Sequence, residues 1–384
     1  MKNNRSSIAN SIAKSTMLGL FFVGAFAQSS FAQNSRTEVV IGTSAAFTGR
    51  TSASIKAFNE GAQIQFDIVN KRGGIGGRKI IYASLDDGNL PELVVENTKR
   101  LLDDDKAIAL FGYAGDATVN AALPIIAQRN VALVGAITGA QSHRSHPNLF
   151  PLRASYHAEV EKIVGQNLQL GKTRFAIFYQ NDEFGKDVVA GLEKSLAKRK
   201  LTIASSGEYA RNSINLGAAV TNTLRGNPQA IIMACTLEAC AEFVRQSAKL
   251  KSTARLNHLA SIDAGAYFKE LGSLTLGLEL THVVPLPTSI GIPVINDFSK
   301  DTKEVASKHV PSLLSLEGYL AAKVMVEALR RAGNYPTRAK VLEALNNMGE
   351  LNLNGFSVSY APSANIGSTY ADISIIGPGG RLKN

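Results

Sequence analysis

The stretch from Lys106 to Gly139 constrains the fold of this 384-residue chain more than any other. Two short apolar runs, Ala107 to Phe111 and Val131 to Val134, each end at a glycine and predict buried parallel strands. Between them, Asp116 to Gln128 carries apolar residues at helical spacing and predicts a crossover helix. Because such a crossover brings both strand carboxyl ends to one sheet edge, the two following turns are expected to lie side by side.

These two turns, Gly112 to Thr118 and Gly135 to Gly139, have the composition of a binding edge. Open α/β sheets bind ligands where their strands end. Both turns offer small residues, free backbone N–H groups and the hydroxyls of Thr118 and Thr138, and the first turn also opens a helix. The expected chemistry is hydrogen bonding to a small polar or anionic group, without an evident nucleophile.

The same alternation of strand, turn and helix recurs along the chain. Glu38 to Gly42 predicts a first strand, followed by a turn that contains Phe47 and by a helix from Ser52 to Lys71. A second array of strands and helices extends from Thr173 to Val284, which predicts an α/β protein with two such units. Near the C-terminus, two further strands, 356–360 and 370–376, are expected to form a hairpin.

The composition is that of a globular protein long enough for two cores, with 45% hydrophobic and 19% charged residues. The formal charge is +10, and Lys2, Arg5 and Lys14 fall in the leader, which leaves about +7 in the mature chain. The basic residues are scattered, whereas a nucleic-acid interface gathers them on one face. No nucleic-acid partner is therefore expected.

The N-terminus reads as a secretory signal peptide. Its basic region precedes an apolar run from Met17 to Ala27 and a small-x-small site, and cleavage is expected after Ala32. A membrane anchor is the alternative, but the run is shorter than the ~20 residues that span a bilayer. No cysteine lies near the cleavage site, so the protein is expected to be exported without lipidation.

Few residues offer catalytic or metal chemistry. Cys235 and Cys240 are expected to form either a disulfide or two buried thiols, and a zinc site is the weakest reading because no histidine lies near them in sequence. The stretch that contains His143 and His146 is interpreted as a surface loop. The chain contains neither a G-x-S-x-G nor an H-E-x-x-H motif. We expect no catalytic site, no metal and no cofactor.

Several segments together resemble one known family. They are EVVIGTSAAFTG from Glu38, the block FNEGAQIQFDIVNKRGGIGGRKI from Phe58, LFGYAG from Leu110, VALVGAITGA from Val131 and FYQNDEFG from Phe178. In this order and spacing they resemble the periplasmic substrate-binding proteins of the branched-chain amino acid (Leu/Ile/Val) type. That resemblance implies the type I periplasmic fold, in which two Rossmann-like lobes with central parallel sheets are joined by three crossovers.

The resemblance also implies a layout and partners. It places residues 33–152 and 286–352 in an N-terminal lobe, and residues 153–285 and 353–384 in a C-terminal lobe. A monomeric protein in the periplasm is expected to close over a small ligand and deliver it to an inner-membrane ABC permease. A secreted ligand sensor on the same fold is the alternative, and a secreted two-lobed enzyme is less favoured.

Site residues follow from the family's motif position by position. The ligand's carboxylate is expected at the two turns described above, an aromatic residue comes from the second lobe, and an acid there holds the ligand's amino group. The candidate ligand-binding residues are Phe47, Gly115, Asp116, Ala117, Thr118, Ala136, Ile137, Thr138, Phe184, Thr236 and Asp263.

Asp116 departs from that pattern, because the family usually has Ser or Thr there. An aspartate at a helix start can satisfy the helix amides itself, and its charge repels an anion. Two readings are open: Asp116 pairs with an ammonium group, or the ligand lacks a carboxylate at this end.

Overall fold

The computed structural model describes residues 37–49, 51–362 and 364–383. The expected signal peptide, residues 1–32, and its cleavage after Ala32 lie outside the described residues. Among the described residues, no helix combines the length and the apolar character needed to cross a bilayer.

The first sheet is fully parallel, with the order β2-β1-β3-β4-β5. Its strands are β1 (Glu38–Ala45), β2 (Lys79–Asp86), β3 (Ala109–Phe111), β4 (Leu133–Val134) and β5 (Leu149–Phe150). The crossover predicted from the sequence is present: α3 (Asp116–Gln128) connects β3 to β4, and these strands pair in parallel. Both following turns therefore lie at one edge of this sheet.

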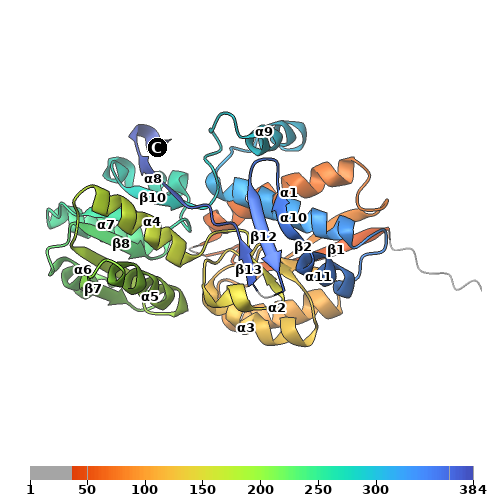
Figure 1. Cartoon of the computed structure of the whole chain (residues 1–384), viewed down its shortest axis with the longest axis horizontal. Helices are drawn as coiled ribbons and strands as arrows, with labels where there is room; N and C mark the ends of the chain where they lie inside the picture. Colours follow the sequence, from red (N-terminus) through yellow and green to blue (C-terminus); the bar gives the residue numbers. More distant parts are fainter. Residues whose placement is uncertain (1–36, 50, 363, 384) are drawn as a thin grey trace, which may run out of the picture. The chain divides into compact units, whose positions relative to one another are not determined.

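Helices cover both faces of the first sheet (Figure 1). They are α1 (Ser52–Lys71), α9 (Pro293–Val305), α10 (Leu313–Arg331) and α11 (Arg338–Asn346) on one face, and α2 (Pro91–Asp103) with α3 on the other. Helices α1 and α10 meet at two glycines. A Cβ at Gly61 would lie 1.7 Å from the Ser315 carbonyl oxygen, and one at Gly318 would lie 1.9 Å from that of Phe58. Only glycine permits this close backbone approach.

The second sheet has the order β15-β14-β10-β9-β8-β6-β7. Its strands are β6 (Phe175–Gln180), β7 (Ile203–Tyr209), β8 (Ala230–Ala234), β9 (Arg255–His258), β10 (Glu279–His282), β14 (Asp372–Ile376) and β15 (Leu382–Lys383). One face is covered by α4 (Tyr156–Gln169) and α5 (Glu183–Ala197). The other carries α6 (Gly217–Leu224), α7 (Leu237–Lys249) and α8 (Ala264–Leu271). The five strands from β6 to β10 are parallel, so their carboxyl ends also share one edge.

The C-terminal region differs from the expected hairpin. A third, antiparallel sheet joins β11 (Gly349–Asn352), β12 (Ser357–Ala361) and β13 (Ala364–Gly367), whereas β14 pairs with β10 in the second sheet. The hairpin prediction was wrong because β12 pairs with β11 and β13, which leaves β14 to pair with β10.

This small sheet packs with the first sheet rather than the second. Tyr360 lies in the first core, and its hydroxyl donates a hydrogen bond of 3.0 Å to the carbonyl oxygen of Pro151. Asn365 donates one of 2.8 Å to that of Leu149. The stretch up to Gly367 therefore packs with the first sheet. Short 3-10 helices at Ser142–Ser145, Gly272–Thr275 and Pro378–Gly380 complete the described elements.

The chain passes between the two sheets three times: after β5, after β10 and after β13. The first crossing carries Arg153, whose guanidinium is fully buried with the carboxylate of Glu317 on α10. Both Arg153 Nε and Nη2 donate to Glu317 oxygens at 2.7 Å. This bidentate ion pair connects the first crossing to α10, which follows the second crossing.

Removing one member of this pair is expected to be costly. Glu317→Ala leaves the Arg153 guanidinium buried without its carboxylate, which should lower the free energy of unfolding by about 3–5 kcal/mol. Urea denaturation followed by circular dichroism measures this difference. The double variant Arg153→Met/Glu317→Leu removes both charges of the pair and should be closer to the wild type than Glu317→Ala is. A double variant as unstable as the single one would contradict this explanation.

Candidate functional site

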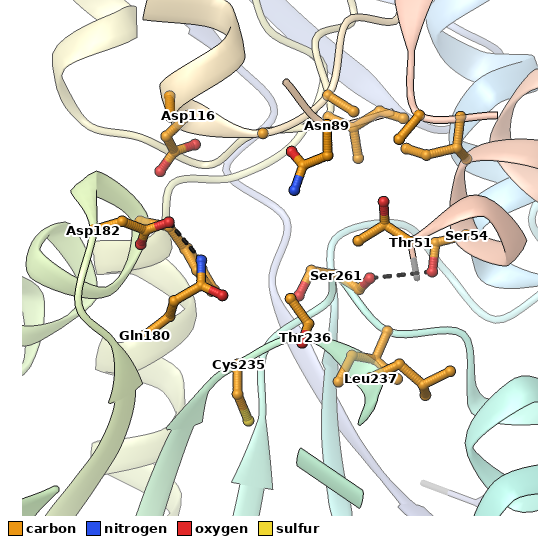
Figure 2. Close-up of a pocket in the computed structure, with 18 of the residues that line it drawn as sticks. Thr51, Ser54, Asn89, Asp116, Gln180, Asp182, Cys235, Thr236, Leu237 and Ser261 are labelled. Carbon is orange, nitrogen blue, oxygen red and sulfur yellow. Dashed lines mark hydrogen bonds between the residues drawn. The ribbon is translucent and has the colours of Figure 1, made fainter. Parts of the chain in front are cut away.

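A cavity of about 130 Å³ lies where the carboxyl ends of the parallel strands of the two sheets face each other (Figure 2). That is room for several water molecules or one small organic ligand. Its wall is largely apolar, and the polar side chains that line it come from both sheets. They are Thr51, Ser54, Asn89, Asp116, Tyr156, Gln180, Asp182, Arg211, Thr236 and Ser261.

The structure brings six of the eleven candidate residues to this cavity. Gly115, Asp116, Ala117, Ile137, Phe184 and Thr236 line it. Gly115 and Ile137 lie in the turns after β3 and β4, and Asp116 and Ala117 begin α3. Phe184 lies in the first turn of α5, after β6, and Thr236 lies in the turn after β8. The other five, Phe47, Thr118, Ala136, Thr138 and Asp263, are not part of its wall.

Local hydrogen bonds explain why some of these side chains point elsewhere. The Thr118 hydroxyl donates to the backbone carbonyls of Ala114 and Gly115, at 2.8 Å for the latter. The backbone N–H of Phe47 donates to Asp86 at 2.9 Å, and its ring packs against the first core. Asp263 is the N-cap of α8, where its carboxylate accepts from the N–H of Ala266 at 2.8 Å.

Asp116 is the first residue of α3 and does not cap it. The N-cap is Gly115, which takes a φ of +88° that glycine adopts without strain. The carboxylate turns away from the helix amides: Oδ1 accepts hydrogen bonds from the hydroxyls of Thr138 and Tyr156, the latter at 3.3 Å. Thr138 thus supports Asp116 from behind the cavity wall. Asp116 Oδ2 is buried and has no hydrogen-bond partner among the described residues.

The surroundings of Asp116 disfavour its charged form. Burial raises the pKa of Asp116 to about 7, and the negative charges of Asp187 and Asp182 add to this effect, while the hydroxyls of Thr138 and Tyr156 oppose it. Its carboxyl group therefore changes charge near neutral pH.

His143 lies behind Thr138 and is buried, not part of a surface loop as expected. Its Nε2 lies 2.7 Å from Oδ1 of Asn120. Burial lowers the pKa of His143 to about 4, so the imidazole is neutral at neutral pH.

Two polar contacts across the cavity were missed by the sequence analysis. Arg211, after β7, donates from Nη2 to both the carbonyl oxygen and Oδ1 of Asn89, after β2, at 3.1 Å. The Ser54 hydroxyl on α1 donates to the carbonyl oxygen of Ser261, after β9, at 3.4 Å. Their places at strand ends were the available signal, since every turn after a parallel strand reaches this edge.

Aromatic rings form one side of the cavity. Tyr156 begins α4, directly after the Arg-Ala-Ser segment of the first crossing, with Ser155 as its N-cap. Its ring meets that of Phe184 edge-on at a centroid distance of 5.0 Å. The Tyr156 hydroxyl is thereby held beside Asp116, and the Phe184 ring is left facing the cavity.

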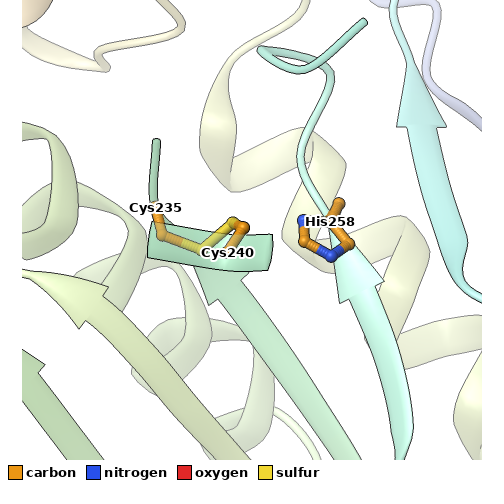
Figure 3. Close-up of side chains that lie close together, drawn as sticks. All are labelled: Cys235, Cys240 and His258. Carbon is orange, nitrogen blue, oxygen red and sulfur yellow. A yellow bond between two sulfur atoms is a disulfide. The ribbon is translucent and has the colours of Figure 1, made fainter. Parts of the chain in front are cut away.

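Cys235 and Cys240 form a disulfide, which decides between the two readings of the sequence (Figure 3). The bond joins the turn after β8 to α7, at a Cα–Cα distance of 5.5 Å. His258 lies close to both sulfurs, and its Nε2 is 2.7 Å from the Tyr267 hydroxyl. Because the sulfurs are bonded to each other, neither is a thiolate that could bind a metal.

Comparison with known proteins places the chain among binding proteins. A family described as periplasmic binding protein matches residues 38–370. The crystal structure of a substrate-binding periplasmic protein from Ralstonia solanacearum is 35% identical, with a TM-score of 0.85, over 90% of this chain and 99% of that one.

Two curated relatives are more distant. An amino acid binding protein from Pseudomonas aeruginosa is 23% identical over 79% of this chain and 81% of its own length. A Leu/Ile/Val-binding protein homolog 3 from Brucella melitensis is 21% identical over 89% of this chain and 92% of its own. The matched family covers all strands of the first sheet and the five parallel strands of the second.

The raised pKa of Asp116 has a consequence for stability. The folded-state pKa of about 7 lies above the ordinary value of 3.8, so the folded protein holds the proton more tightly than the unfolded chain. The free energy of unfolding should therefore fall as the pH rises from about 4 to about 7. The variant Asp116→Asn has no carboxyl group to ionise at this position and should not show this fall. Its free energy of unfolding relative to the wild type should therefore rise by up to about 4 kcal/mol between pH 4 and pH 8.

Thermal or urea unfolding of both proteins at several pH values measures this gain. The two stability curves should separate progressively as the pH rises. Curves that stay parallel would show that Asp116 ionises in the folded protein as easily as in the unfolded chain.

Proposed function

The chain belongs to the periplasmic binding protein family, and from this premise we propose that it is the extracytoplasmic solute-binding subunit of an ABC importer. The proposed ligand is a small polar molecule, an amino acid or a related small organic acid or amide. It is captured in the cavity by hinge closure and passed to an inner-membrane permease. The observation that carries this proposal is the cavity itself, whose polar groups come from both sheets.

The contribution of both sheets matters because it couples binding to closure. A ligand that touches Asp116 after β3 and also Thr236 after β8 interacts with both lobes only when they are close together. It therefore favours the closed arrangement by its differential affinity for that state. The three crossings near the edge of both sheets are the segments about which such a motion takes place.

The wall of the cavity supports a ligand with an apolar body. Ile55, Ile137, Phe184, Leu237 and Ile262 line it beside the polar groups. This combination fits a small aliphatic or aromatic molecule with one polar end. The names of the Pseudomonas and Brucella relatives, which refer to amino acids and to Leu/Ile/Val, agree with this class.

The proposed binding residues are the six predicted ones that reach the cavity, namely Gly115, Asp116, Ala117, Ile137, Phe184 and Thr236, together with Tyr156, Asn89 and Arg211. Export by a cleaved signal peptide to the periplasm and action as a monomer complete the proposal. A ligand sensor would use the same cavity, and it differs only in the membrane partner that receives the closed form.

Ligand-induced stabilisation tests the binding role. A dye-monitored melting scan of the mature protein should find stabilising compounds among aliphatic amino acids, amines, carboxylic acids and small amides. A ligand at about a hundred times its dissociation constant adds about 2.7 kcal/mol to the free energy of unfolding. Dye or calorimetric detection suits this chain, which contains no tryptophan.

The variant Phe184→Ala provides the matched test of the site. It removes a half-buried ring from the cavity wall and should weaken binding of the stabilising compound about tenfold. Because the ring also packs against Tyr156 and the second core, the melting temperature without ligand should fall, and the ligand-induced shift is measured against each protein's own ligand-free value. Stabilisation that is as strong in Phe184→Ala as in the wild type would place the ligand elsewhere in the protein.

A further inference from the structure

We propose that the cavity holds its ligand by a cationic nitrogen bound to Asp116, in the lobe opposite to the one where the family resemblance places the ligand's amino group. This inference rests on the proposed solute-binding role and specifies the ligand class. The ligand is a primary ammonium compound with an apolar body, such as an aliphatic amino acid or amine.

The first observation is the unused acceptor in the cavity wall. Asp116 is 3% exposed, and its Oδ2 has no partner among the described residues, although Oδ1 accepts from Thr138 and Tyr156. A buried acceptor without a donor costs free energy. An ammonium group supplies three donors and a compensating charge, and it suits an ionised carboxylate better than any neutral donor.

The second observation is the sign of the charges around this carboxylate. Asp182 lines the same cavity, and both it and Asp187 act electrostatically on Asp116. Figure 2 shows Asp116 and Asp182 on the same side of the cavity. Arg211, which also lines the cavity, is held by its hydrogen bonds to Asn89. A ligand carboxylate brought to Asp116 would meet like charges, whereas a cation is attracted by all three acids.

The third observation removes the competing acid. The resemblance assigns the ligand's amino group to an acid of the second lobe, and Asp263 was the candidate. Its carboxylate instead caps α8 through the N–H of Ala266, and it does not line the cavity. The neighbours that do line it, Ser261 and Ile262, carry no charge.

Asp182 is an acid of the second lobe that does line the cavity, but both of its oxygens are engaged: Oδ1 accepts from the N–H of Gly185 and Oδ2 from Nε2 of Gln180. Of the acids in the wall, Asp116 in the first lobe is the one with an oxygen that has no partner among the described residues.

The groups that face Asp116 determine how binding depends on pH. Thr138 and Tyr156 contact it, and burial raises the pKa of Tyr156 well above its ordinary value. His143, behind Thr138, is neutral because burial lowers its pKa to about 4. Asp182 and Asp187, at the start of α5, act electrostatically on Asp116. Oδ1 of Asp187 lies 3.3 Å from Nε2 of His157.

The sign of the pH dependence separates the two possible ligand polarities. With a pKa of about 7 in the free protein, Asp116 is about one-tenth ionised at pH 6 and about nine-tenths ionised at pH 8. A ligand whose ammonium needs the ionised carboxylate should therefore bind about tenfold more tightly at pH 8 than at pH 6. A ligand carboxylate bound by the protonated acid should show the opposite trend.

Isothermal titration calorimetry of the mature protein tests this with three probes that share one apolar body. These are leucine, 3-methylbutylamine, which lacks the carboxylate, and 4-methylpentanoate, which lacks the amine. We expect leucine or the amine to bind, with an affinity that rises about tenfold from pH 6 to pH 8, and 4-methylpentanoate to bind at least tenfold more weakly. Tighter binding of 4-methylpentanoate, with affinity falling as pH rises, would overturn the inference and leave the solute-binding role intact.

Two isosteric variants complete the test. Asp116→Asn keeps the shape and the acceptor oxygen but removes the charge, so it should weaken binding of the amine at pH 8 by at least tenfold and abolish the pH dependence. Asp263→Asn, which keeps a capping oxygen, should change neither. Loss of binding in Asp263→Asn alone, or a pH dependence that persists in Asp116→Asn, would overturn the inference. Binding of none of the three probes by the folded wild type would count against this ligand class and the amino acid reading together.

Discussion

The parallel pairing of strands is the constraint on which the rest of this structure depends. Five parallel strands in the first sheet and five in the second end at edges that face a common cavity. Every turn that follows such a strand is thereby placed near the cavity, whatever its sequence. The chain uses this arrangement to bring residues as distant in sequence as Thr51 and Ser261 to one small volume. The buried pair of Arg153 and Glu317 then fixes a crossing segment against α10 without entering the cavity.

Asp116 is the point at which stability and binding conflict. A carboxyl group that is 3% exposed and only half satisfied by hydrogen bonds weakens the fold when it ionises. The simplest explanation for a buried aspartate here is that its negative charge binds a ligand. A serine or threonine would fill the position without the free-energy penalty of a buried charge. Asp182 and Asp187 increase this cost in the free protein and increase the attraction for a cation.

Local patterns predicted most of the architecture. The apolar spacing from Asp116 to Gln128 and the helix expected from Ser52 to Lys71 have the bounds of α3 and α1, because periodicity and turn residues are encoded within each segment. The pairing of β12 was not predictable in this way, since its partners are two short segments with weak strand signals. The role of Asp263 was also mispredicted. The family motif assigned its carboxylate to the ligand, but the carboxylate caps α8 by accepting a hydrogen bond from the N–H of Ala266. Arg211 and Asn89 are 122 positions apart and meet only through the fold.

A crystal structure of the protein with a bound stabilising ligand would show directly which group meets Asp116. A ligand nitrogen should lie within hydrogen-bond distance of Asp116 Oδ2, about 2.7–2.9 Å for an ammonium and a carboxylate. The apolar part of the ligand should lie against Phe184, and Asp263 should still cap α8. A ligand carboxylate beside Asp116, or a ligand amino group bound by Asp263, would contradict the proposed binding of a cation by Asp116.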